Sequence, residues 1–198
     1  MATVVSLRAQ LEPALSDAVA ACLAAHGFVA RKGRVVRRLP GVTQTILHSA
    51  SYFHGTAASV QPQLRIEFPA IADLLHRSDL GRAAPGVSQP ITFPAGTSAQ
   101  GWMVYAADQI EPVIGELLPV LEGRTLPLCD DITDLDALVR AFTQDDPRIL
   151  FLDAGIAAVM AGLLRQGRRD EARALAVVRG RGVDVVCREW PALGAELL

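Results

Sequence analysis

The sequence has few of the residues that build metal centres, disulfide frameworks or aromatic surfaces. Three of its 198 residues are cysteines, and 5% are aromatic. Cys22, Cys129 and Cys187 lie far apart, are odd in number and lack the CxxC spacing of a metal or redox site. We therefore expect three buried free thiols in a reducing compartment and no metal site.

Long apolar runs and a strong charge of either sign are also missing. Arg8, Glu12 and Asp17 interrupt the N-terminal region, which leaves no signal-peptide core. The most apolar later stretch, ILFLDAGIAAVMAGLL, contains Asp153 and is too short to span a bilayer. The net charge of −2 gives no global attraction to nucleic acid or membrane. We expect a cytoplasmic protein, and the alanine-rich composition with Lys32 as the sole lysine suggests a bacterium with a GC-rich genome.

Hydrophobic spacing predicts an N-terminal helix followed by a sheet. Apolar residues recur at helical intervals from about residue 7 to 25. A period of two then predicts strands over 28–39, 42–49 and 60–68, with a possible edge strand at 91–93. Alternation in the third strand indicates an antiparallel sheet with one wet face. The face that we expect to be buried carries Val60, Leu64, Ile66 and Phe68.

From Trp102 onward the spacing predicts helices. The segment AGLLRQGRRDEARAL resembles one tetratricopeptide unit, a helical hairpin turned at Gly167, but no second copy follows. We predict a single α+β domain over residues 1–198. An antiparallel sheet of about four strands packs against the N-terminal helix in residues 1–101, and a C-terminal helical bundle or hairpin forms in residues 102–198.

A basic stretch, RKGRVVRR, is the first candidate site. Strand geometry divides its arginines between two faces, and no aromatic residues are interleaved with them for stacking on bases. A solvated hairpin is therefore the favoured interpretation, with anion or nucleic-acid binding as the alternative. The residues that would bind an anion are Arg31, Lys32, Arg34 and Arg38.

A second candidate site surrounds the stretch HSASYFHG. Its serines and histidines have poor geometry for a nucleophile and its base, and acidic residues that could complete a metal site are absent nearby. The sequence has no phosphate-binding loop, dinucleotide fingerprint or zinc-protease motif, so we predict no catalytic residue and no cofactor. A small ligand pocket is the alternative, lined by His48, Tyr52, His54, Arg65 and Trp102.

Several segments taken in order resemble the bacterial domain-of-unknown-function 4304 family. They are the opening helix ending in HGF, then RKGRVVRR, QTILHSASYFHG, QPQLRIEFP, GWMVY, LEGRTLPLCDDITDLDALVRAF and AAVMAGLLRQGRRDEARAL. The stretch SASYFHG differs from the residues that are more common at this place in the family. The family has no established activity, so the resemblance implies an α+β fold and a soluble bacterial protein.

Three functions follow from these observations. The absence of a catalytic constellation and the single helical hairpin favour a protein-binding or adaptor domain whose partner is another protein. A small-molecule or enzymatic site between sheet and helices is the second alternative. Nucleic-acid or anion binding through the basic hairpin is the third.

Overall fold

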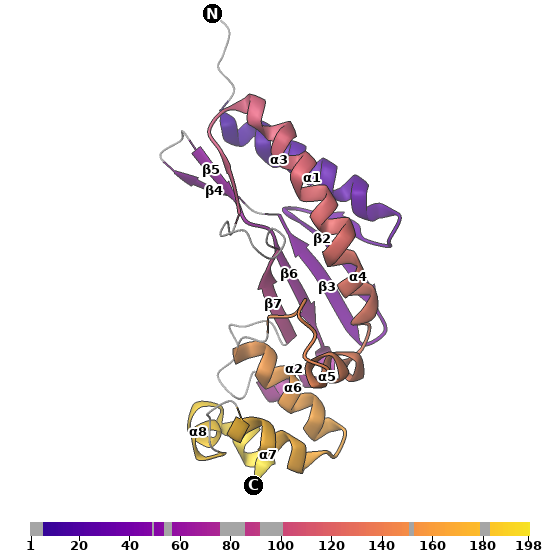
Figure 1. Ribbon diagram of the computed structural model, residues 1–198, viewed down its shortest axis with the longest axis vertical. Coiled ribbons are helices and arrows are strands. Elements are labelled where there is room, and N and C mark those ends of the chain that lie inside the picture. Colours follow the sequence, from indigo (N-terminus) through magenta and orange to yellow (C-terminus); the bar gives the residue numbers. More distant parts are fainter. Residues whose placement is uncertain are drawn as a thin grey trace, which may run out of the picture. The chain divides into compact units, whose positions relative to one another are not determined.

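The computed structural model describes residues 6–48, 50–53, 57–75, 86–91, 101–150, 153–178 and 183–198 (Figure 1). Within these ranges the fold is α+β, as predicted, with an N-terminal helix, antiparallel sheets and C-terminal helices. The helical elements are α1 (Leu7–Ala24), α2 (Pro69–Leu75), η2 (Ala107–Gln109), α3 (Ile110–Val120), η3 (Leu121–Thr125), α4 (Leu126–Asp131), α5 (Leu135–Thr143), α6 (Asp153–Arg165), α7 (Arg169–Val178), α8 (Val183–Glu189) and α9 (Pro191–Leu197). The strands are β1 (Val29–Arg31), β2 (Arg34–Leu39), β3 (Val42–Leu47), β4 (Ala50–Phe53), β5 (Ala57–Val60), β6 (Gln63–Glu67), β7 (Gly86–Pro90) and β8 (Trp102–Val104).

The strands of the described ranges form two sheets where one of about four strands was expected. Their orders are β1-β2-β3-β6-β7 and β4-β5-β8. The predicted strand over 60–68 divides at Pro62, whose missing N–H cannot join a ladder. Its predicted inner face is nevertheless confirmed, because Val60, Leu64, Ile66 and Phe68 are all buried.

The structure differs from two expectations for the middle of the chain. Trp102 does not begin the helical part but lies on β8, where it pairs with Val60 of β5. The edge strand expected at 91–93 is found instead at β7, before Ile91, and residues 92 and 93 lie outside the described residues. β8 has three residues, too few for a period of two to be recognised, and the five residues of β7, GVSQP, do not alternate between apolar and polar.

The chain divides into two compact units that are interleaved in the sequence. Unit 1 comprises residues 1–38, 44–64 and 90–128, and unit 2 comprises 39–43, 65–89 and 129–198. The boundaries fall inside β2, β3, β6, β7 and α4 rather than in linkers. Each unit therefore takes strands from the first half of the chain and helical residues from the second.

The core of unit 1 forms where α1 meets α3 and the small sheet. Ser6 caps α1 by accepting a hydrogen bond from the N–H of Ala9 at 3.3 Å, and Gly27 turns the chain out of the helix at φ +79°. The helix packs against α3, β1 and β5, and α1 and α3 lie side by side in Figure 1. The fully buried stripe of α1 is Leu11, Leu15, Val19 and Leu23.

Unit 2 is built around α6, which packs against α2, α5, α7 and α9. Gly162 permits the close approach of α6 to α5, because a Cβ there would lie 3.0 Å from Cγ2 of Val139. Gly167, at φ +72°, turns the chain between α6 and α7 and so confirms the predicted hairpin. The last helix, α9, begins at Pro191, since proline is well tolerated at a first helical position.

The contact between α8 and α9 depends on Gly194. A Cβ at this position would overlap the Cα of Cys187 and lie 2.8 Å from its backbone nitrogen. We expect Gly194→Ala to lower the free energy of unfolding by about 1–3 kcal/mol, because two backbones must separate. Urea denaturation followed by circular dichroism measures this change.

Gly115→Ala is the matched control for this prediction. Gly115 lies inside α3, and nothing lies within 4 Å of a Cβ built there. The same substitution should therefore raise stability by about 0.5–1 kcal/mol through helix propensity alone. Equal effects of the two substitutions would contradict the proposed overlap at Gly194.

Candidate functional site

The basic hairpin consists of β1 and β2 joined by a two-residue turn at Lys32 and Gly33. Arg31 pairs with Arg34 across the turn, and Gly33 has the positive φ of +68° that favours glycine. Arg31, Lys32 and Arg34 are exposed together at this end, whereas Arg38 is exposed farther along β2. The predicted division of the arginines between two strand faces is confirmed. The turn therefore gathers three of the four predicted anion-binding residues.

Arg37 occupies the inner face of β2 and was missing from the predicted site. Its Nε donates to Oε1 of Gln44 at 2.6 Å, and Nη1 donates to the carbonyl of His26 at 3.3 Å. Its guanidinium lies 4.9 Å from the centre of the Phe28 ring. Arg37 thus joins β2 to β3 and to the segment that follows α1. Alternation along β2 was the sequence signal that placed it inside.

His48 follows β3 and is only 5% exposed. Its backbone N–H donates to the carbonyl of Gly33 at 3.4 Å, which brings the histidine beside the basic turn. Neither ring nitrogen has a hydrogen-bond partner among the described residues. Burial lowers the pKa of His48, because the charged imidazolium is poorly solvated there. At neutral pH the ring is therefore uncharged and offers one donor and one acceptor.

His48 is one of the residues that line a pocket of about 680 Å³, which we name the α1 pocket. The β side supplies the turn, His48 and the start of β4, whereas α1 supplies the facing wall. The described residues that line it all belong to unit 1. They are Arg8, Glu12, Pro13, Ser16, Lys32, Gly33, His48 and Ala50.

The sequence analysis did not predict that α1 forms a wall of the site, although the regular spacing of its polar residues is visible in the sequence. Arg8, Glu12 and Ser16 recur every four residues, which places them on one helix face. Arg8 Nε donates to Oε1 of Glu12 at 3.0 Å, so these two charges offset each other. The guanidinium of Arg8 also lies 5.3 Å from the centre of the Tyr52 ring. Burial, and then the nearby Glu12 carboxylate, raise the pKa of Tyr52.

Trp102 and Arg65, two further residues of the predicted ligand site, do not line this pocket. Trp102 is buried, and its Nε1 donates to Oε2 of Glu116 at 3.0 Å. Arg65 lies half-buried on β6 in unit 2, and its Nε is buried without a hydrogen-bond partner. His54 lies outside the described residues. Of the predicted ligand-binding residues, His48 lines the pocket. Tyr52 is not among the lining residues, but its ring lies against the guanidinium of Arg8, which is one of them.

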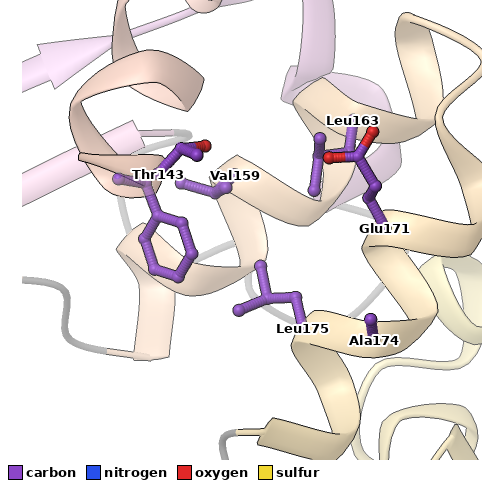
Figure 2. Close-up of a pocket in the computed structure, with 7 residues that line it drawn as sticks. Thr143, Val159, Leu163, Glu171, Ala174 and Leu175 are labelled. Atoms are coloured by element: carbon purple, nitrogen blue, oxygen red, sulfur yellow. The ribbon is translucent and has the colours of Figure 1, made fainter. Parts of the chain in front are cut away.

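A second hollow, the α6–α7 groove, lies in unit 2 and has a volume of about 450 Å³. Figure 2 shows Val159 and Leu163 on α6 and Leu175 on α7 around one space, with Thr143 of α5 across it. Glu171 is the charged residue among those that line it, and two hydrogen bonds join its carboxylate to Arg168. The lining, completed by Phe142 and Ala174, is predominantly apolar.

A third, polar recess of about 190 Å³ surrounds Arg148 and is already satisfied internally. Arg148 forms ion pairs of 2.7 Å with both Asp131 and Asp146. The hydrogen bonds from Arg148 hold the pKa of Asp146 below its usual range. These groups fix the 146–149 turn, and we assign no ligand to them.

The described residues contain neither a membrane-spanning helix nor a cluster of metal-ligating side chains. None of the helices in these ranges is both long and apolar enough to cross a bilayer. No three side chains among His, Cys, Asp and Glu come together there as metal ligands would.

Comparisons with protein-family models, curated proteins and solved structures gave no match. The resemblance to the domain-of-unknown-function 4304 family therefore stays a prediction.

The burial of His48 predicts a pH dependence of stability. Because its pKa is lower in the folded chain than in the unfolded chain, the unfolded chain takes up the extra proton as pH falls. The free energy of unfolding should therefore fall as pH drops below about 6.5, by about 1.4 kcal/mol for each unit between the two pKa values. Urea denaturation between neutral pH and mild acid measures this fall.

His48→Gln should remove this component, whereas His26→Gln, at an exposed histidine, should retain it. The charged groups lining the pocket around His48 are Arg8, Glu12 and Lys32, and they are the same in both variants. Parallel pH profiles for wild type and His48→Gln would contradict the prediction.

Proposed function

We propose that this protein binds a small molecule in the α1 pocket. The observation that carries the proposal is His48, which is buried and lines the pocket, and whose ring nitrogens both lack a hydrogen-bond partner among the described residues. A buried polar group left unpaired costs about 1–3 kcal/mol. A ligand that hydrogen-bonds to the ring recovers this cost and gains orientation from it.

The size and composition of the α1 pocket support the same function. Its volume falls within the roughly 300–1,000 Å³ of ligand sites in proteins. Its polar groups come from both walls, with Arg8, Glu12 and Ser16 on α1 and Lys32 and His48 opposite. The proposal is one of binding and assigns no reaction to the site. The three free cysteines support a reducing compartment such as the cytoplasm.

Blocking the α1 pocket tests the proposal. Ser16→Trp puts an indole at the pocket wall, whereas Ala21→Trp puts the same group on an exposed part of the same helix. Each protein is dialysed against a small-molecule extract of bacterial cells, and the compounds that it retains are identified by mass spectrometry. Wild type and Ala21→Trp should retain a compound that Ser16→Trp loses at least about tenfold, equivalent to about 1.4 kcal/mol.

Either of two results would count against binding in this pocket. Wild type could retain no compound, or all three proteins could retain the same compounds equally. Circular dichroism melting confirms that both tryptophan variants are folded before they are compared.

The α6–α7 groove supports a second function, that of the protein-binding adaptor predicted from the sequence. Its apolar floor suits apolar side chains from one face of a partner helix. Because Glu171 is the charged residue of the lining, we propose that this helix also carries a basic residue. The Arg168–Glu171 pair is largely exposed and contributes little to stability, so it can exchange for such a contact.

Site-specific photo-crosslinking tests this adaptor function. A benzophenone side chain at Ala174 lies in the groove, whereas one at the exposed Val177 lies on the same helix outside the lining. We expect Ala174 but not Val177 to capture an apolar helical segment with a flanking Lys or Arg. Equal capture at both positions, or no capture at Ala174, would overturn the adaptor function.

A further inference from the structure

The charge around the α1 pocket identifies the class of its ligand. From Ala18 to Ile66 the chain contains no Asp or Glu, so the whole β side of the pocket lacks a negative side chain. Glu12 is the acidic residue of the lining, and Arg8 offsets it at 3.0 Å. Lys32 is then left as the uncompensated charge among the residues that line the pocket. Arg31 and Arg34 flank it in the same turn and add to the positive potential.

His48 adds a second requirement on the ligand, which concerns hydrogen bonding rather than charge. The low pKa of the buried ring keeps it neutral, so it does not itself attract an anion but can donate one hydrogen bond and accept another. Backbone bonding between His48 and Gly33 holds the ring close to the turn that carries Lys32. A cation and a neutral donor–acceptor group therefore lie on the same side of one pocket.

We propose that the α1 pocket binds a small organic anion whose acidic group pairs with Lys32 while a neutral polar part contacts the His48 ring. This inference rests on the proposed function and specifies its ligand. A polyanion such as nucleic acid fits these observations less well, because the pocket contributes one uncompensated cation and Arg38 lies away from the turn. The inference concerns carboxylates and phosphate esters alike, because a lysine ammonium binds both as a point charge.

Three probes of the same shape and different charge test this inference, namely benzoate, benzamide and benzamidine. Two nuclear magnetic resonance signals report on the two protein groups that we propose contact the ligand. Nitrogen-15 labelling reports the His48 ring, whose resonances are identified by their loss in His48→Gln. Reductive methylation with carbon-13 reports Lys32 as a single side-chain signal, because it is the chain's only lysine and methylation keeps its charge.

We expect benzoate to shift both signals and to bind at least about fivefold more tightly than benzamide, as one exposed charge contact of about 1 kcal/mol provides. In unmethylated protein, Lys32→Gln should weaken benzoate binding by about the same factor. The matched control is Arg31→Gln, which removes an equal charge one residue outside the lining and should change affinity less than about twofold. Melting curves show whether each variant is folded.

The outcomes separate this inference from the proposed function on which it rests. If benzamide or benzamidine shifts the His48 signals and benzoate does not, the pocket is a ligand site but the anion assignment is wrong. Benzoate binding that Lys32→Gln leaves unchanged, or that Arg31→Gln weakens equally, would overturn the role of Lys32. No shift with any probe up to its solubility limit would count against the inference and the proposed function together.

Discussion

The buried guanidinium of Arg37 joins the basic hairpin to β3 and to the segment that follows α1. Burial of a charge is costly unless protein groups replace the lost water, and here the Gln44 side chain, the His26 carbonyl and the face of Phe28 do so. These partners come from β3 and from the segment between α1 and β1. The planar fork of arginine can reach them together, which the point charge of a lysine could not. The end of α1, the basic hairpin and β3 are thereby held in one arrangement.

Much of the fold could be predicted because its main signals are local. The α1 stripe, the alternation ending at Phe68 and the hairpin at Gly167 all appear as regular spacing over consecutive residues, and the structure confirms them. The division into two sheets could not be predicted. It depends on Pro62 and on pairing between β5 and β8, which lie about forty residues apart and are too short to show a period.

The candidate site shows the same limit. His48 and Lys32 were recognisable as polar residues near a turn, but the hollow between them and α1 exists only once distant segments pack. Arg8 and Glu12 form an exposed i,i+4 ion pair, and pairs of this kind are common on solvated helices that line no pocket. A function without catalysis was expected because motifs for nucleophiles, metals and cofactors were absent. A binding pocket needs no such motif, and it is therefore the kind of site that sequence patterns reveal least.

The interleaving of the two units has a consequence for how the protein is made. During synthesis the ribosome releases unit 1 as three separate segments, the last of which ends at residue 128. By then the parts of β2, β3, β6 and β7 that belong to unit 2 have been synthesised, but the C-terminal helices of unit 2 have not. The sheet β1-β2-β3-β6-β7 is complete by residue 90, but the residues from 129 onward that complete unit 2 are synthesised later. No single cut in the chain separates the two units, so neither unit could be produced alone as one continuous segment.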